Sequence, residues 1–200
     1  MKRLILVPVI IGLFGCTGEE DGRSTVGGER NGAAEDVAMT NPDPMKDAPL
    51  ASSTGPEYAA AASASDSFEI QSSEIALQKT RNRAIRQFAQ MMIADHRKSE
   101  AELKRAAQEA GIAIASPPQL DLEQQANLIE LRQANGAEFD KVYLQQQMAG
   151  HSNALALVQA YAQDGTVAPL KQHAANVAGP ISRHLDRTRQ LQGEKPDPRS

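Results

Sequence analysis

Arg86-Gln-Phe-Ala-Gln-Met-Met-Ile-Ala-Asp-His-Arg-Lys-Ser-Glu-Ala-Glu-Leu103 is the stretch of sequence that decides the fold class. In and around this stretch, apolar residues recur every three or four positions, as on one face of an α-helix: Ile85, Phe88, Met92, Leu103, Ala106 and Ala110. His96 lies on the same stripe, with Asp95 beside it. An imidazole therefore occupies a position where a core side chain is expected.

Two later segments repeat this arrangement of a histidine within an apolar stripe. His151 lies between Leu144 and Val158 at helical spacing, and His184 lies between Ile181 and Leu191. Three inward-facing histidines on three helices form the constellation most able to carry chemistry in this chain.

The remaining periodicity predicts an all-α fold, an antiparallel four-helix bundle occupying residues 56–192. The four long helices are expected at residues 56–80, 83–110, 137–163 and 166–192, with a short extra helix at 121–134 between the second and the third. Gly111 should stop the second helix, and Asp121 should cap the short one. Pro180 lies inside the fourth long helix and should kink it.

Composition limits the classes of protein to consider. The chain has 200 residues, a formal net charge of −4, no Trp and 4% aromatic residues, which fits one Ala-rich helical domain. It has no basic stripe with stacking aromatics, so we expect no nucleic-acid partner. It also lacks a Gly-rich phosphate loop and a Ser-His-Asp order, so we expect no enzymatic activity.

The N-terminus reads as an export signal followed by an attachment site. Met1-Lys-Arg is followed by an apolar run at residues 4–14, too short to span a bilayer. Leu13-Phe-Gly-Cys16 resembles the lipobox of bacterial lipoproteins, which implies cleavage after residue 15 and lipid on Cys16. The alternative is an ordinary secretory signal with an incidental cysteine.

The lipid anchor would place the protein on a membrane. Because Thr17, and not aspartate, follows the cysteine, we expect the periplasmic face of the outer membrane. Residues 16–55 are polar and rich in Gly, Pro and acids, which predicts a disordered tether, and residues 193–200 a flexible tail.

The depth of each histidine can be estimated from the helical rise. His96 lies roughly 21 Å from the Arg81-Asn82 turn, and His151 roughly 20 Å from the Asp164-Gly165 turn. His184 lies roughly 28 Å from the latter turn, so the three rings share a layer if the two turns lie at the same end. Imidazole is a favoured ligand of zinc and copper, so a mononuclear zinc or copper site is one hypothesis.

Three carboxylates could assist these histidines. Glu74 lies on the line from Ile70 to Leu77 and is the natural acid to face inward as a further metal ligand. Asp66 matches the level of His96 better, but a second possible helix start at residues 65–66 would make it an N-cap. Asp95 could orient an imidazole as an outer partner, or pair with a basic residue.

The competing interpretation is that each histidine is a core residue hydrogen-bonded to a carboxylate or hydroxyl. Met92 and Met148 would then be core packing and not copper ligands. A lipid-anchored binding or structural module is the leading hypothesis, with a periplasmic metal-binding protein as the alternative. A bundle that binds a protein partner is a third, and it would need an exposed apolar patch.

Three segments together resemble a known family. Phe88-Ala-Gln-Met-Met-Ile-Ala-Asp-His96, Phe139-Asp-Lys-Val-Tyr143 with Met148-Ala-Gly-His151, and Pro180-Ile-Ser-Arg-His-Leu185 resemble the bacterial domain-of-unknown-function family 4142. The resemblance implies an exported helical bundle of ferritin-like type, since members are commonly described as predicted outer-membrane proteins. It implies no activity.

The ferritin-like resemblance can be tested against the ligands of di-iron bundles. Those centres use Glu-x-x-His motifs, but Ile93, Met148 and Ile181 stand three places before the histidines here. The sequence therefore does not favour di-iron chemistry.

Overall fold

The computed structural model describes residues 54–193, and every regular element in that range is a helix. The helices are α1 (Gly55–Lys79), α2 (Arg83–Glu109), α3 (Leu122–Gln133), α4 (Gly136–Asp164) and α5 (Ala168–Leu191). No strand occurs in the described range. The predicted all-α class is confirmed, with four long helices and a short one between the second and third of them.

Local sequence signals explain where these helices begin and end. The Thr54 side chain accepts from the backbone of Glu57, and the Glu57 carboxylate accepts from the backbone of Thr54, which closes a capping box at the start of α1. Asp121 and Gln124 form the same motif at α3. The helical segment of α2 ends just before Gly111, whose φ of +68° favours a residue without a side chain.

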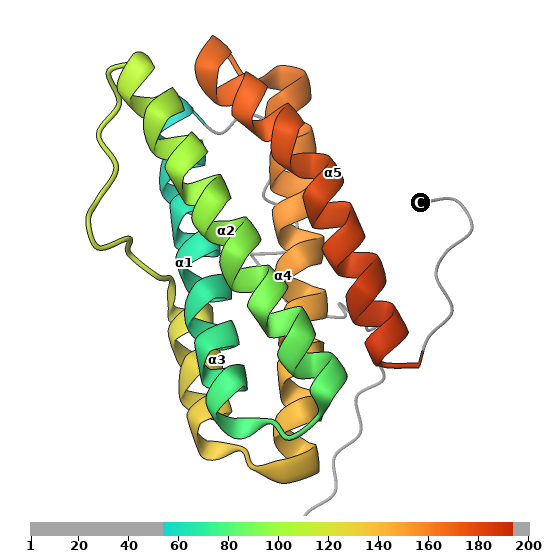
Figure 1. Cartoon of the computed structure of the whole chain (residues 1–200). Coiled ribbons are helices and arrows are strands. Elements are labelled where there is room, and N and C mark those ends of the chain that lie inside the picture. Colours follow the sequence, from blue (N-terminus) through green and yellow to red (C-terminus); the bar gives the residue numbers. More distant parts are fainter. Residues whose placement is uncertain (1–53, 194–200) are drawn as a thin grey trace, which may run out of the picture. The chain divides into compact units, whose positions relative to one another are not determined.

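The long helices lie side by side along one direction (Figure 1). α1 packs against α2 and α4, α5 packs against α4 and α2, and α3 covers α1 and α4. The α1–α2 turn and the α4–α5 turn lie at opposite ends of the domain (Figure 1), so the premise of a common end is wrong. The histidines of α2 and α4 still meet because each lies near the middle of its helix.

The buried apolar residues form two separate clusters. The first cluster contains Tyr58, Leu103, Tyr161 and Leu170, and the second cluster contains Phe88, Leu131, Phe139 and Tyr143. Between them along the helices lies a buried polar layer, which includes Asp66, Glu69, His96, Gln147, His151 and His184. Burying polar groups costs free energy unless they are paired, so this layer needs an explanation other than packing.

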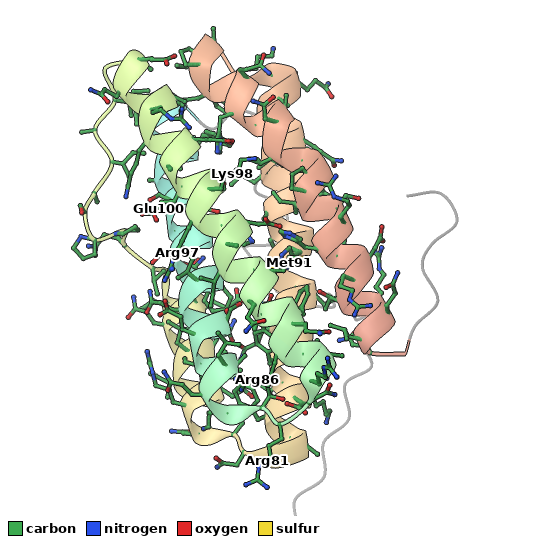
Figure 2. All side chains as sticks on the ribbon, in the orientation of Figure 1. Arg81, Arg86, Met91, Arg97, Lys98 and Glu100 are labelled. Carbon is green, nitrogen blue, oxygen red and sulfur yellow. The ribbon has the colours of Figure 1, made fainter. Side chains whose placement is uncertain are left out.

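The outer surface of the domain is charged. Arg86, Arg97 and Glu100 lie along the outward side of α2 (Figure 2). Within residues 54–193, no helix is both long and apolar enough to cross a membrane. The predicted signal peptide, the lipidation site Cys16 and most of the tether lie outside the described residues, as does most of the tail.

Candidate metal centre

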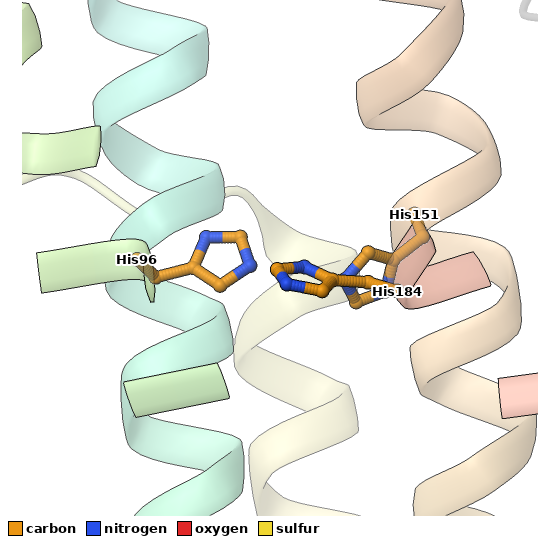
Figure 3. Close-up of side chains that lie close together, drawn as sticks. All are labelled: His96, His151 and His184. Atoms are coloured by element: carbon orange, nitrogen blue, oxygen red, sulfur yellow. The ribbon is translucent and has the colours of Figure 1, made fainter. Parts of the chain in front are cut away.

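His96, His151 and His184 point toward one another from α2, α4 and α5 (Figure 3). One ring nitrogen from each lies within 4.8 Å of those from the other two. The ring centroids are 5.4 to 5.8 Å apart. The three residues are 0 to 4% exposed, so the cluster belongs to the interior and not to the surface.

One nitrogen of each ring donates a hydrogen bond to a carboxylate or carbonyl oxygen outside the cluster. His96 Nδ1 donates to Asp66 Oδ1 at 2.8 Å, and His184 Nε2 donates to Asp95 Oδ2 at 2.8 Å. His151 Nδ1 donates to the backbone carbonyl of Gln147 at 2.7 Å. Metal-binding histidines are oriented in this way in proteins, by a carboxylate or a carbonyl on the nitrogen that does not bind the metal.

The other nitrogen of each ring is buried and has no hydrogen-bond partner within the described part of the chain: His96 Nε2, His151 Nε2 and His184 Nδ1. Because the partnered nitrogen of each neutral ring carries the proton, these three atoms carry lone pairs. Three atoms at most 4.8 Å apart surround a point within about 2.8 Å of each, and Zn–N bonds are about 2.0–2.1 Å. Small side-chain rotations would bring all three to bonding distance.

The electrostatics of the layer differ from ring to ring. Burial lowers the pKa of His151 to about 3, with a contribution from the charge of His96, so His151 is neutral at physiological pH. Burial also lowers the pKa of His184, although Asp95 opposes the shift. Burial would lower the pKa of His96 as well, but the hydrogen bond and charge of Asp66 outweigh it and raise the pKa. One proton can therefore reside on the cluster, at His96.

Glu69 is a fourth buried group of the layer. It is 1% exposed and accepts a hydrogen bond from Gln147 Nε2 at 2.5 Å, and its Oε1 lies 3.8 Å from His151 Nδ1. Burial raises the pKa of Glu69 to about 7, although the His96 charge and the Gln147 hydrogen bond oppose the shift. Glu69 therefore lies on the Nδ1 side of His151, away from the three converging nitrogens, and is not one of the candidate metal ligands.

A cavity of about 400 Å³ leads to the cluster between α2 and α5. Asp66, His96 and His184 line it, whereas His151 does not and lies deeper. Pro180 also lines this cavity and has no N–H to donate, so the carbonyl of Asn176 loses its helical partner at the same wall. α5 nevertheless continues through Pro180 to Leu191. The cavity gives small molecules a route to two of the three histidines.

Glu74 does not belong to the centre, so its prediction as a metal ligand is wrong. Its side chain is 46% exposed and forms an ion pair with Arg97 at 2.9 Å. The buried stripe of α1 runs through Ala62, Asp66, Glu69, Ser73 and Ala76 and not along Ile70 and Leu77. Ala and Ser occupy much of this face because small side chains allow the helices to pack closely. A pattern of large apolar residues therefore does not identify the buried face of α1.

The structure decides between the two roles that the sequence allows for Asp66. Because α1 begins at Gly55, Asp66 lies in the middle of the helix, 5% exposed and bonded to His96, and is not an N-cap. Asp95 lies against His184, in the outer position predicted for it. The sequence prediction does not include Glu69 and Gln147. Glu69 lies three residues after Asp66, and Gln147 lies four residues before His151. This helical spacing, which places each on the same face as its neighbour, could have identified them.

The fourth histidine has a different environment. His173 Nδ1 is 2.8 Å from the hydroxyl of Tyr58, whose ring stacks on Tyr161 at a centroid distance of 4.0 Å. His173 is a buried residue outside the cluster. It therefore provides a natural control for experiments on the other three.

The partner-binding alternative would need an exposed apolar patch. Among the described residues, the exposed large hydrophobic side chains are Met91, Leu122 and Ile129. Leu122 and Ile129 both lie on α3, and Met91 lies on α2. Single exposed apolar residues of this kind are normal on protein surfaces.

Gly150→Ala is expected to destabilise the protein. A Cβ at this position would lie 2.7 Å from Glu69 Oε1, and this buried carboxylate is held through its other oxygen, Oε2, by Gln147. We expect a loss of about 1–3 kcal/mol in the free energy of unfolding, measured by urea denaturation. The control is Gly179→Ala, also on a helix, where the nearest atom would be 3.6 Å away. Equal stability of the two variants would contradict the packing described around Glu69.

Glu69→Gln is expected to change how the stability of the metal-free protein depends on pH. The folded-state pKa of Glu69 is raised from 4.5 to about 7, so the folded state binds this proton more tightly than the unfolded state. Its stabilisation is present below pH 4.5 and is lost as the pH rises through about 7. The neutral amide removes this loss, so the variant should be more stable than wild type at pH 8 by about 3 kcal/mol. Denaturation at pH 5 and 8 tests this, and an unchanged difference at the two pH values would contradict it.

Comparison with known proteins gives the family of the chain. The model of a family described as "Domain of unknown function (DUF4142)" matches residues 40–191, which contain the whole helical domain. The chain belongs to this family, as the three sequence segments predicted. No curated protein and no solved structure matches the chain significantly.

Proposed function

We propose that the chain is a metal-binding protein, in which His96, His151 and His184 bind one zinc or copper ion at the centre of a ferritin-like four-helix bundle. The observation that carries this proposal is the set of three converging, buried ring nitrogens, which have no partners among the described residues. A bound cation would be coordinated by these nitrogens and would remove the cost of burying polar atoms without a partner.

The buried polar layer supports the same proposal. Asp66, Asp95 and the Gln147 carbonyl fix the orientation of each ring. Asp66 and Asp95 would also offset part of the charge of a divalent ion. Met92 belongs to the second apolar cluster, and the group of His, Cys, Asp and Glu side chains that could hold an ion consists of the three histidines. Such a set suits zinc(II) and copper(II).

The test is metal analysis of the full chain in detergent. After incubation with zinc(II) or copper(II) and removal of free metal, we expect one ion per chain, as measured by elemental analysis. Competition between the two ions then distinguishes zinc from copper. If neither ion binds, the proposal is wrong, and the three histidines are core residues that share buried water.

We also propose that the domain is anchored at the periplasmic face of the outer membrane through lipidated Cys16, as a binding module without catalytic activity of its own. The sequence Leu13-Phe-Gly-Cys16 supports the anchor. The polar residues 17–53 offer a spacer between the lipid and Thr54.

Cys16→Ser is expected to release the protein from the membrane fraction, because no thiol remains for lipid attachment. The measurement is fractionation followed by immunoblotting, with Thr17→Ala as the neighbouring control that should stay membrane-bound. A Cys16→Ser protein that is still lipidated and sediments with membranes would contradict the anchor.

A further inference from the structure

The proposed metal site, on which this inference rests, lies in the interior of the bundle. The ring nitrogens that would bind the ion, His96 Nε2, His151 Nε2 and His184 Nδ1, are buried. An ion from solvent can reach such atoms in two ways, through an opening between helices or by transient unfolding of part of the bundle. These two ways differ in whether particular side chains border the path of the ion.

The structure contains an opening, the cavity of about 400 Å³ between α2 and α5. α2 and α5 pack against each other and face the viewer side by side in Figure 1. The lining includes the buried His96 and His184 and also exposed residues such as Lys98. The cavity therefore leads from the surface of the domain to two of the three candidate ligands.

The charges on the wall of this cavity favour a cation. Three acids line it, Asp66, Asp95 and Glu102, against two bases, Lys98 and Arg183. The side chains of the acids are 7 to 47% exposed, whereas that of Lys98 is 77% exposed and Arg183 is also exposed. Because water screens exposed charges more strongly than enclosed ones, the acids dominate the field inside the cavity.

Glu102 is the acid of this wall that does not hold a histidine ring. Asp66 and Asp95 each accept a hydrogen bond from a histidine. Glu102 instead forms a loose ion pair with Lys98, whose ammonium lies 3.9 Å from the carboxylate. Carboxylate oxygens bind zinc, so Glu102 can attract an ion without disturbing the orientation of the rings.

We propose that the metal ion enters and leaves the site through the α2–α5 cavity, attracted by Glu102, so that the site exchanges its ion with solvent. One ring must turn to admit the ion. His184 is that ring, because its partner Asp95 is half exposed and water can replace their hydrogen bond, whereas Asp66, the partner of His96, is buried. A site that exchanges its ion suits a carrier or store of the metal and not a purely structural ion.

The role of Glu102 is tested by the rate at which the full chain in detergent binds zinc, followed by stopped-flow mixing with a zinc-responsive dye. Glu102→Gln should lower the association rate constant by about twofold to fivefold at low salt, and less at high salt, since one partly exposed charge is lost. Glu100→Gln is the matched control. Glu100 lies on the same helix and also pairs with a lysine four residues away, but it does not line the cavity.

The path itself is tested by narrowing the cavity. Asn176 lines it from an exposed position on α5, so Asn176→Trp adds a large ring at the wall. The variant should slow zinc binding and zinc release by the same factor, about tenfold or more, because both directions cross one barrier. The Kd for zinc should then be unchanged. Ala175→Trp is the control, at an exposed neighbouring position that does not line the cavity.

The outcomes separate the path from the metal site. If zinc binds but Asn176→Trp and Ala175→Trp share both rates, the ion enters by opening of the bundle, and the path is refuted while the metal site stands. If Glu102→Gln and Glu100→Gln bind zinc at the same rate, the role of Glu102 is refuted. If zinc does not bind, the proposed function fails, and the path fails with it.

Discussion

His151→Ala is expected to remove most of the rise in melting temperature that zinc gives the wild-type protein. A metal that binds only the folded state stabilises it by about 4 kcal/mol at a thousandfold excess over Kd, which corresponds to roughly 10 °C or more. His151 is the deepest of the three ligands and is neutral at physiological pH, so its lone pair is available without loss of a proton. Its removal should weaken zinc binding by more than about 100-fold, the upper range for loss of an outer partner. Differential scanning fluorimetry with and without zinc measures this.

His173→Ala is the matched control for that experiment. It removes the same side chain from another buried position, where the partner is Tyr58 and not the cluster. We expect a lower melting temperature but an unchanged zinc response. If the triple variant of His96, His151 and His184 kept the wild-type response, the zinc effect would come from elsewhere on the chain.

Phe88→Ala is expected to cause a large loss of stability. Phe88 is 2% exposed, belongs to the second apolar cluster and packs edge-on against Tyr143 at a centroid distance of 6.3 Å. Truncation of a buried Phe to Ala costs about 3–5 kcal/mol, a large part of the roughly 5–15 kcal/mol that typical domains have. Urea denaturation followed by circular dichroism would measure the loss.

Met91→Ala provides the comparison on the same helix. Met91 is 37% exposed (Figure 2), so its truncation should change the free energy of unfolding by less than about 0.5 kcal/mol. Similar losses from the two variants would mean that the α2 stripe is not buried as described.

Periodicity was sufficient for most of the fold. The stripe through Phe88 and Met92 on α2, the cap at Asp121 and the stop at Gly111 are local features, and local sequence encodes them. Which end of the domain each turn between helices occupies depends on the path of the whole chain. For that reason periodicity did not reveal that the α1–α2 and α4–α5 turns lie at opposite ends, although it placed the histidines correctly on inward faces.

The candidate site was predictable in its histidines and in Asp95, but the inward-facing carboxylates of α1 were not identified with certainty from the sequence. A histidine within an apolar stripe stands out, as His96 and His151 do. On α1 the inward face has Tyr58 and Phe68 but is otherwise mostly Ala and Ser with Asp66 and Glu69, and such a polar face resembles a solvated one. The partly exposed Ile70 and Leu77 therefore pointed to Glu74 instead. Only the packing of α1 against α2 and α4 reveals which acids are enclosed.

The buried polar layer also gives a reason why this domain would bind an ion. Ten buried side-chain atoms in the described range have no hydrogen-bond partner, and three of them are the converging ring nitrogens. Burial of such atoms without a ligand destabilises the fold, so a bound ion would be part of the stable state and not an addition to it.

The most direct measurement is a crystal structure of the zinc-loaded full chain with diffraction data collected on both sides of the zinc absorption edge. We expect one strong anomalous peak about 2.0–2.1 Å from His96 Nε2, His151 Nε2 and His184 Nδ1, at the end of the α2–α5 cavity. A peak bound by other residues, or three rings bridged by water with no anomalous signal, would contradict the proposed metal centre.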